Sequence, residues 1–361
     1  MGYYSEVQKG NVESSMVLAV PRSVSSALSK ALSMSPDFGL YIFQPFYTSD
    51  EKTTELDNYI RKAQTDKAAT PQDPLKVIMK VMAESVNGQR FQQLMRHSKN
   101  ICTLLRDPQS QALSAFRAYN ELPSGQNMNA AELKKLGEMR NCDTLHEYIV
   151  TPWKHMEKDI AQLEKRTRDY GTPNWVVLDG DIMRAAPERT LKQLCQRFGI
   201  SYSPRMLEGW KQGEDKTVGI AGKNYSRNWL ARVQQSSGLK KPTCMTPRLE
   251  DFAPRVRQRI EHNLVIYTRA LAHEETLAPT SQELRHMIDS EGFHHTCPVA
   301  CYAMAATGLQ SSAALRMQTL RKIRDEEPAY ASSYAIIDKT LGVFVGSGAS
   351  PVAARYASAR R

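Results

Sequence analysis

Long apolar runs, clustered cysteines and a leader-like start are all missing from this 361-residue chain. No stretch approaches the roughly eighteen consecutive apolar residues that a membrane-spanning helix needs, so no span is predicted. The first residues lack the basic start and apolar centre of a secretory signal, and the six cysteines are scattered, which argues against a disulfide framework. We therefore expect a cytoplasmic protein with reduced thiols.

Glycine is also absent between Ser14 and Asp37, where a loop of the form Gly-x-x-x-x-Gly-Lys-Ser/Thr would need it. A Walker-type nucleotide loop is therefore excluded from this stretch. What stands there is a short apolar strand at 16–20, then Pro21, a polar turn and the start of a helix. Such a junction suits phosphate, because the first helical N–H groups lack intrahelical partners and lie at the positive end of the helix dipole.

The letters from Pro21 to Leu28, PRSVSSAL, resemble the 5′-phosphosulfate loop of sulfotransferases, in the branch that has Pro-Arg-Ser. These enzymes use 3′-phosphoadenosine 5′-phosphosulfate (PAPS), which leaves as 3′-phosphoadenosine 5′-phosphate (PAP). The resemblance implies that one segment holds the 5′-phosphosulfate: Arg22, Ser23, Val24, Ser25, Ser26 and Ala27. The alternative interpretation is a serine-capped helix after an arbitrary strand.

A second apolar strand, 100–105, runs directly into Arg106 and then into a helix that contains Ser114. In sulfotransferases an arginine at such a strand end and a serine about two turns later hold the 3′-phosphate, and the resemblance implies this role for Arg106 and Ser114. A dianionic phosphate suits the pair, because a planar guanidinium and a hydroxyl both donate hydrogen bonds to it. The alternative is a surface arginine at a helix start.

Catalytic groups are expected at the ends of two further strands. Lys80 lies at the carboxyl end of strand 75–81, where the family often has a lysine near the leaving bridging oxygen, and Arg22 is assigned to the same charge neutralisation. Gln44 follows strand 38–43 where relatives carry a carboxylate, and an amide cannot accept the acceptor's proton. Glu84 is then our candidate base, with a solvated helix-start glutamate as the alternative.

Contacts with the acceptor are predicted at Gln44, Tyr47 and His155, the last within a helical insertion at about 127–170. In this family such an insertion shapes the acceptor pocket. Ordinary packing is the alternative for His155. The residue types do not separate a small molecule from a glycan or lipid, nor a hydroxyl from an amine.

Positive charge is concentrated late in the chain. The net charge is +10, and residues 222–260 contribute nine Lys or Arg against two acids. Within this segment Lys240 and Lys241 are predicted as a second clamp on the 3′-phosphate, with Arg227 as the alternative. A basic patch favours an anionic ligand, and an anionic acceptor is one possibility; nucleic acid is disfavoured because no nucleic-acid-binding signature accompanies the charge.

The alternation of strands and helices predicts an α/β fold, a P-loop-like parallel sheet with helices on both faces. The sulfotransferase resemblance covers about residues 15–245, and the α/β domain is expected to span 1–275. A C-terminal extension, 276–361, is predicted to contain helices and a small α+β appendage, a β-hairpin plus a helix, through which a homo-oligomer could form. Its His and Cys residues at 293–301 are read as helix packing, so no metal site is predicted.

The function implied by the resemblance is metal-independent sulfuryl transfer from PAPS to a hydroxyl or amine. Two other classes remain open. One is a P-loop kinase or hydrolase, disfavoured by the missing Gly-Lys-Ser/Thr. The other is a degenerate relative that binds a nucleotide or another anion without catalysis, and the amide at Gln44 is the best argument for it.

Overall fold

The computed structural model describes residues 2–43, 53–67, 73–83, 88–119, 142–171, 173–208, 217–218, 237–239, 252–271, 273 and 276–277. The chain forms two compact units. One unit comprises residues 1–106, 118–122 and 151–241, and the other comprises 107–117, 123–150 and 242–361. The predicted extension from 276 onward lies almost entirely outside the described residues, so the domain boundary at 275 stays a prediction.

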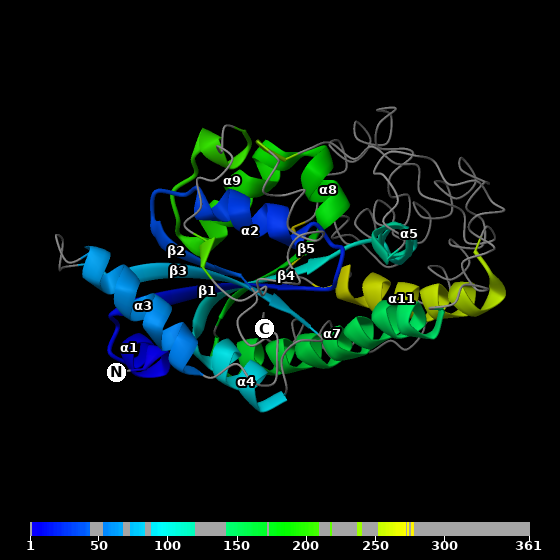
Figure 1. The fold of residues 1–361 in the computed structure, drawn as a ribbon, viewed down its shortest axis with the longest axis horizontal. Coiled ribbons are helices and arrows are strands. Elements are labelled where there is room, and N and C mark those ends of the chain that lie inside the picture. The colour runs from blue at the N-terminus through cyan, green and yellow to red at the C-terminus, as the bar shows by residue number, and fades with distance from the viewer. Residues whose placement is uncertain are drawn as a thin grey trace, which may run out of the picture. The chain divides into compact units, whose positions relative to one another are not determined.

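The first unit is built on six parallel strands in the order β5-β4-β1-β3-β2-β6, of which Figure 1 labels the first five. Their bounds are β1 Val12–Ala19, β2 Phe38–Phe43, β3 Leu75–Met82, β4 Ser98–Leu105, β5 Asn174–Asp179 and β6 Thr217–Val218. The predicted α/β fold with a parallel sheet is confirmed. The two-residue strand β6, which pairs with Tyr41 and Ile42, was not predicted.

Helices cover both faces of this sheet (Figure 1). One face carries α2 (Ser25–Ser33), α8 (Gly180–Ala185) and α9 (Pro187–Phe198). The other carries α1 (Tyr3–Gln8), α3 (Thr53–Lys67), α4 (Gly88–His97) and the part of α7 (Cys142–Tyr170) from residue 151 onward. The second unit contains most of α5 (Pro108–Tyr119) and all of α11 (Pro254–Leu271).

The central strands are buried on both faces, as is usual for a parallel sheet with helices on each side. The run from Met16 to Val20 is fully buried, and so is Asn100 on the neighbouring strand β4. The Asn100 amide donates to the Ser15 hydroxyl over 3.0 Å and accepts from the Asn174 amide over 2.9 Å. These buried polar groups are therefore satisfied, which fixes the register of β1, β4 and β5.

Helix α9 shows how the sequence determines its own ends. Pro187 stands in its first turn, where a missing N–H costs nothing. Gly199 follows its last turn with φ 62°, and the Ile200 N–H returns to the Cys195 carbonyl over 3.0 Å. Proline at the start and glycine after the end are thus the local signals that bound this helix.

Asp159 on α7 is a buried acid, with 7% of its surface exposed, and burial raises its pKa to about 8. The folded chain therefore keeps a proton that the unfolded chain releases above about pH 4, and stability falls as the pH rises from about 4 to 8. We expect Asp159→Asn to raise the free energy of unfolding by only about 1 kcal/mol at pH 4.5. At pH 8 it should raise that free energy by about 5 kcal/mol.

Urea unfolding at the two pH values measures this difference. Asp169, exposed on the same helix, supplies the control, and Asp169→Asn should change stability little at either pH. An Asp159→Asn variant that is less stable than the wild type at pH 8 would show that the carboxylate has a favourable charged partner after all.

Within the described part of the chain, no helix is both long and apolar enough to cross a bilayer. The cytoplasmic location stays a prediction.

Candidate functional site

The strand order places a topological switch point between β1 and β4, at the carboxyl ends of these strands. From β1 the chain passes through α2 to β2 on one side, whereas from β4 it continues to β5 on the other side. In open α/β sheets, ligands bind outside the carboxyl ends of adjacent strands whose connections diverge in this way. Arg22 follows β1 and Arg106 follows β4, so the two predicted phosphate-binding turns lie at this switch point. We call these strand-to-helix turns corners: one comprises residues 22–27 and the other begins at Arg106.

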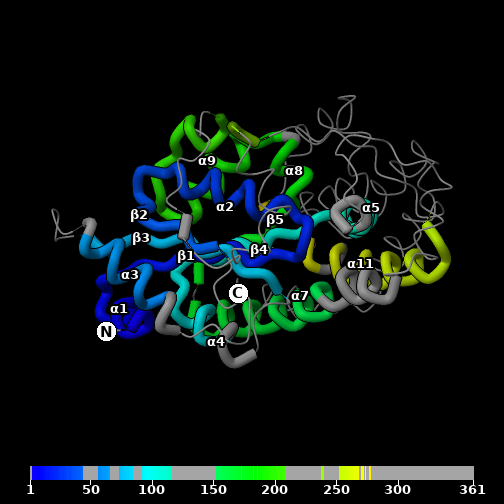
Figure 2. The backbone as a smooth tube through the Cα atoms, in the orientation of Figure 1, coloured from blue at the N-terminus to red at the C-terminus, as the bar shows by residue number. Residues whose placement is uncertain are grey.

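Figure 2 traces the chain through the short loop between β1 and α2. The backbone dihedral angles of this loop are unusual. Arg22 and Val24 both adopt the left-handed conformation, with φ 65° and 70°, although neither is a glycine. Each such residue costs roughly 1–2 kcal/mol, and for a β-branched valine the conformation is a genuine outlier. The Ser23 hydroxyl donates to the Val20 carbonyl over 2.7 Å, which helps to hold the strained turn. Strain of this kind is concentrated at functional sites.

Helix α2 is not capped by a serine side chain, contrary to the alternative interpretation of this stretch. Val24 is the N-cap residue and no side chain caps the helix, while Ser25 and Ser26 already lie in the first turn. The first helical hydrogen bond runs from the Ala27 N–H to the Val24 carbonyl, over 3.0 Å. The N–H groups before it belong to the open, positive end of the helix, which is where an anion is stabilised.

Lys80 reaches the same helix end from strand β3. Its ammonium donates to the Ser26 hydroxyl over 3.0 Å and lies 4.2 Å from the centre of the Phe43 ring, and only 5% of the residue is exposed. A buried cation beside the positive end of a helix is electrostatically unfavourable. An anion bound at that end would be stabilised by both the helix end and the Lys80 ammonium.

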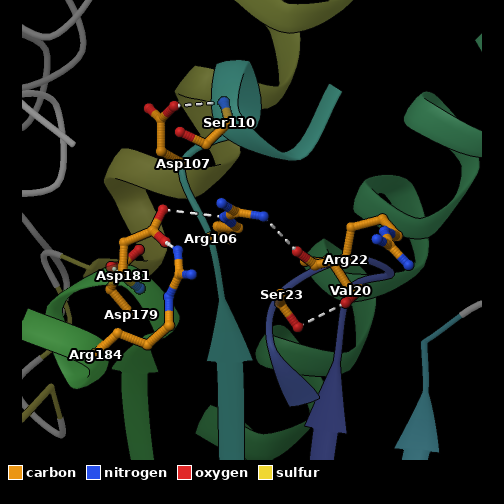
Figure 3. A network of polar contacts seen from close by, with 9 residues as sticks. All are labelled: Val20, Arg22, Ser23, Arg106, Asp107, Ser110, Asp179, Asp181 and Arg184. Carbon is orange, nitrogen blue, oxygen red and sulfur yellow. Dashed lines mark hydrogen bonds and ion pairs between the residues drawn. The ribbon is translucent and has the colours of Figure 1, made fainter. Parts of the chain in front are cut away.

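Arg106 joins the two corners. One terminal nitrogen of its guanidinium donates to the Arg22 carbonyl over 3.1 Å, and its Nε donates to Asp181 over 3.0 Å (Figure 3). The Arg22 side chain extends away from Arg106 in this view. The predicted pair of loops is thus in direct contact, which two unrelated surfaces would not be.

Asp181 was not singled out from the sequence. It lies in the first turn of α8, is fully buried, and is paired with both Arg106 and Arg184. Burial alone would raise the pKa of its carboxyl, but Arg106 and then Arg184 outweigh burial and hold that pKa below its usual range. The group is therefore a carboxylate at neutral pH.

The turn before Asp181 closely approaches the loop between β1 and α2. A Cβ added to Gly180 would lie 2.4 Å from the Ser23 carbonyl oxygen and 3.4 Å from that of Leu105, so only glycine fits without movement. The Asp181 N–H donates to the Asp179 carboxylate over 2.9 Å, which closes the turn. Strand β5 thereby packs its end against both corners. The Asp-Gly-Asp letters after an apolar strand were the available signal.

Ser114 lies on α5 in the second unit and is half-buried. Asp107 directly precedes that helix, and its carboxylate accepts from the Ser110 N–H over 2.9 Å. Its predicted role beside Arg106 stays a prediction.

The late basic loop is anchored at its glycine. Gly238 pairs with Glu208, and the Leu239 N–H donates to the Leu207 carbonyl over 2.9 Å. A Cβ on Gly238 would lie 2.5 Å from the Leu207 carbonyl oxygen, which explains the glycine. Lys240, the first of the two predicted clamps, follows directly.

Several predicted residues lie outside the described part of the chain: Gln44, Tyr47, Glu84, Arg227, Lys240 and Lys241. His155 is described, on α7, where it is half-buried. Burial, together with the nearby Lys158, lowers the pKa of His155, so this histidine is neutral at pH 7. Its contact with an acceptor stays a prediction.

No family model matches this chain, and no curated protein matches it. Among solved structures it is similar to the crystal structure of mouse sulfotransferase SULT7A1 complexed with PAP. The sequence identity is 12% and the TM-score is 0.37, over 74% of this chain and 88% of that one.

Proposed function

We propose that the carboxyl edge of this sheet binds PAPS and transfers its sulfuryl group to a hydroxyl or amine acceptor. The observation that carries the proposal is the hydrogen bond from Arg106 to the Arg22 carbonyl, because it brings two strand-to-helix corners to one place. A nucleotide with a phosphate on each side of its ribose requires two such corners. A simple nucleoside phosphate requires only one.

The residues at the edge suit the two ends of this donor. The 5′-phosphosulfate would lie at the start of α2, where Arg22, Lys80 and the first helical N–H groups supply positive charge. The 3′-phosphate would lie at Arg106, with Ser114, Lys240 and Lys241 as further contacts.

Sulfuryl transfer needs alignment and charge stabilisation more than covalent catalysis by the protein. The acceptor oxygen or nitrogen forms a bond to sulfur, the bond between sulfur and the bridging phosphate oxygen breaks, and its electron pair stays on that oxygen. The Lys80 ammonium would stabilise the charge on the leaving oxygen. The acceptor's proton would pass to Glu84.

Thermal unfolding with added nucleotides tests donor binding directly. PAP should raise the melting temperature in a concentration-dependent way, by more than AMP or ATP-Mg²⁺ at equal concentration, because it alone has both phosphates. A larger shift with ATP-Mg²⁺ would favour the kinase or hydrolase class. Transfer of radiolabelled sulfate from PAPS to a mixed acceptor panel then separates an enzyme from a degenerate PAP-binding relative.

A further inference from the structure

We infer that Asp181 is a positioning residue for the donor site. Its carboxylate holds the guanidinium of Arg106 in the orientation that links the two corners and meets the 3′-phosphate. The inference rests on the proposed function and adds to it a residue on a third strand end, one that touches neither the donor nor the acceptor.

The contacts leave Asp181 little freedom. Its side chain is fully buried, accepts from Nε of Arg106 over 3.0 Å and is paired with Arg184 on the opposite oxygen (Figure 3). Its own N–H is fixed by the Asp179 carboxylate. The close approach of Gly180 to the Ser23 carbonyl oxygen packs the same turn against the loop between β1 and α2.

This arrangement fixes Arg106 before any ligand arrives. A free arginine side chain has much rotamer entropy to lose on binding, whereas a guanidinium already held at Nε and at one terminal nitrogen has lost most of it. The orientation set by Asp181 also places a terminal nitrogen on the Arg22 carbonyl. Without Asp181, both the arginine and the turn that contains Arg22 would lose this support.

The direction in which PAP affinity changes when Asp181 is replaced distinguishes a positioning role from a purely electrostatic one. Asp181 carries a negative charge close to the place where a dianion would bind, so Coulomb's law alone predicts tighter anion binding when the charge is removed. A positioning role predicts the opposite. Asp181→Asn is therefore expected to weaken PAP binding about 30-fold, as measured by isothermal titration.

Arg184→Gln is the matched control. It removes the second ion pair of Asp181 and should lower the melting temperature to a similar extent, but it leaves Arg106 bound to its carboxylate. The affinity of this variant for PAP should stay within about threefold of the wild type. Equal losses of affinity in both variants would reduce Asp181 to a stabilising residue and overturn the inference.

A measurement on the unaltered protein guards against a variant that fails to fold. The side-chain Nε–H signal of Arg106, identified by its absence in Arg106→Lys, should be visible and slow to exchange in ligand-free protein. A signal that appears only with PAP would overturn the inference and leave the proposed function standing. Wild-type protein that binds no PAP would overturn both, whereas wild-type binding with an unaffected Asp181→Asn variant would overturn the inference alone.

Discussion

Replacing Lys80 with methionine is expected to lower the rate of sulfuryl transfer about 100- to 1,000-fold, the usual loss when one stabilising donor is removed from a transition state. In the ligand-free protein we expect the free energy of unfolding to change by less than about 1 kcal/mol, because the hydrogen bond to the Ser26 hydroxyl is lost while a buried charge is removed. The wild-type ammonium is buried, and among its described contacts are a neutral hydroxyl and an aromatic ring at the positive end of α2. Methionine fills similar space without the charge.

Turnover and urea unfolding of the same preparation measure the two effects together. Lys76, half-buried on the same strand but near its other end, supplies the control, and Lys76→Met should leave turnover unchanged. Loss of stability in Lys80→Met together with unchanged turnover would mean that Lys80 is a structural cation rather than part of the donor site.

Replacing Arg106 with alanine should weaken PAP binding about 100-fold and also destabilise the ligand-free protein by about 3 kcal/mol. The affinity is lost because a charged donor to the 3′-phosphate is gone. The stability is lost because Asp181 is fully buried and would keep only Arg184 as a described partner of opposite charge.

Arg106→Lys separates the role of the positive charge from the role of the several N–H donors of the guanidinium. Lysine keeps the charge, but as a single ammonium it cannot replace the guanidinium's donors to both Asp181 and the Arg22 carbonyl. We expect the lysine variant to recover much of the stability and little of the PAP affinity. Titration of PAP at matched ionic strength measures this, and wild-type affinity in Arg106→Ala would exclude Arg106 from the donor site.

The strands that could be predicted are those in which apolar residues predominate. Strand β2 was placed at 38–43 and is found there, and β3 differs from prediction by one residue. The first half of β1 was missed because Glu13, Ser14 and Ser15 look polar, although the two serines are buried in the sheet. Their burial depends on neighbouring strands and helices that a local pattern does not contain.

The loop between β1 and α2 could also be predicted only in part. Its position between a strand and a helix could be predicted from the local sequence. The left-handed backbone at Arg22 and Val24 could not, because glycine is the usual signal for that conformation. The strained turn is supported by groups distant in the sequence. The contact between Gly180 and the Ser23 carbonyl oxygen is one of them.

Asp181 is the clearest case of a residue whose partner could not be predicted from the sequence. Its partner Arg106 is 75 positions away, and the local Asp-Gly-Asp sequence after an apolar strand does not reveal that partner. Arg106 was itself predicted to face a phosphate, yet it also forms a buried ion pair. Long-range pairing of this kind becomes visible only when the sheet order is known.

A crystal structure of the protein with PAP bound tests the central claim most directly. The account predicts the 5′-phosphate at the first turn of α2, against residues 22–26 and Lys80, and the 3′-phosphate on Arg106 with the Arg106–Asp181 pair intact. A nucleotide bound elsewhere, or one whose 3′-phosphate lies away from Arg106, would contradict it.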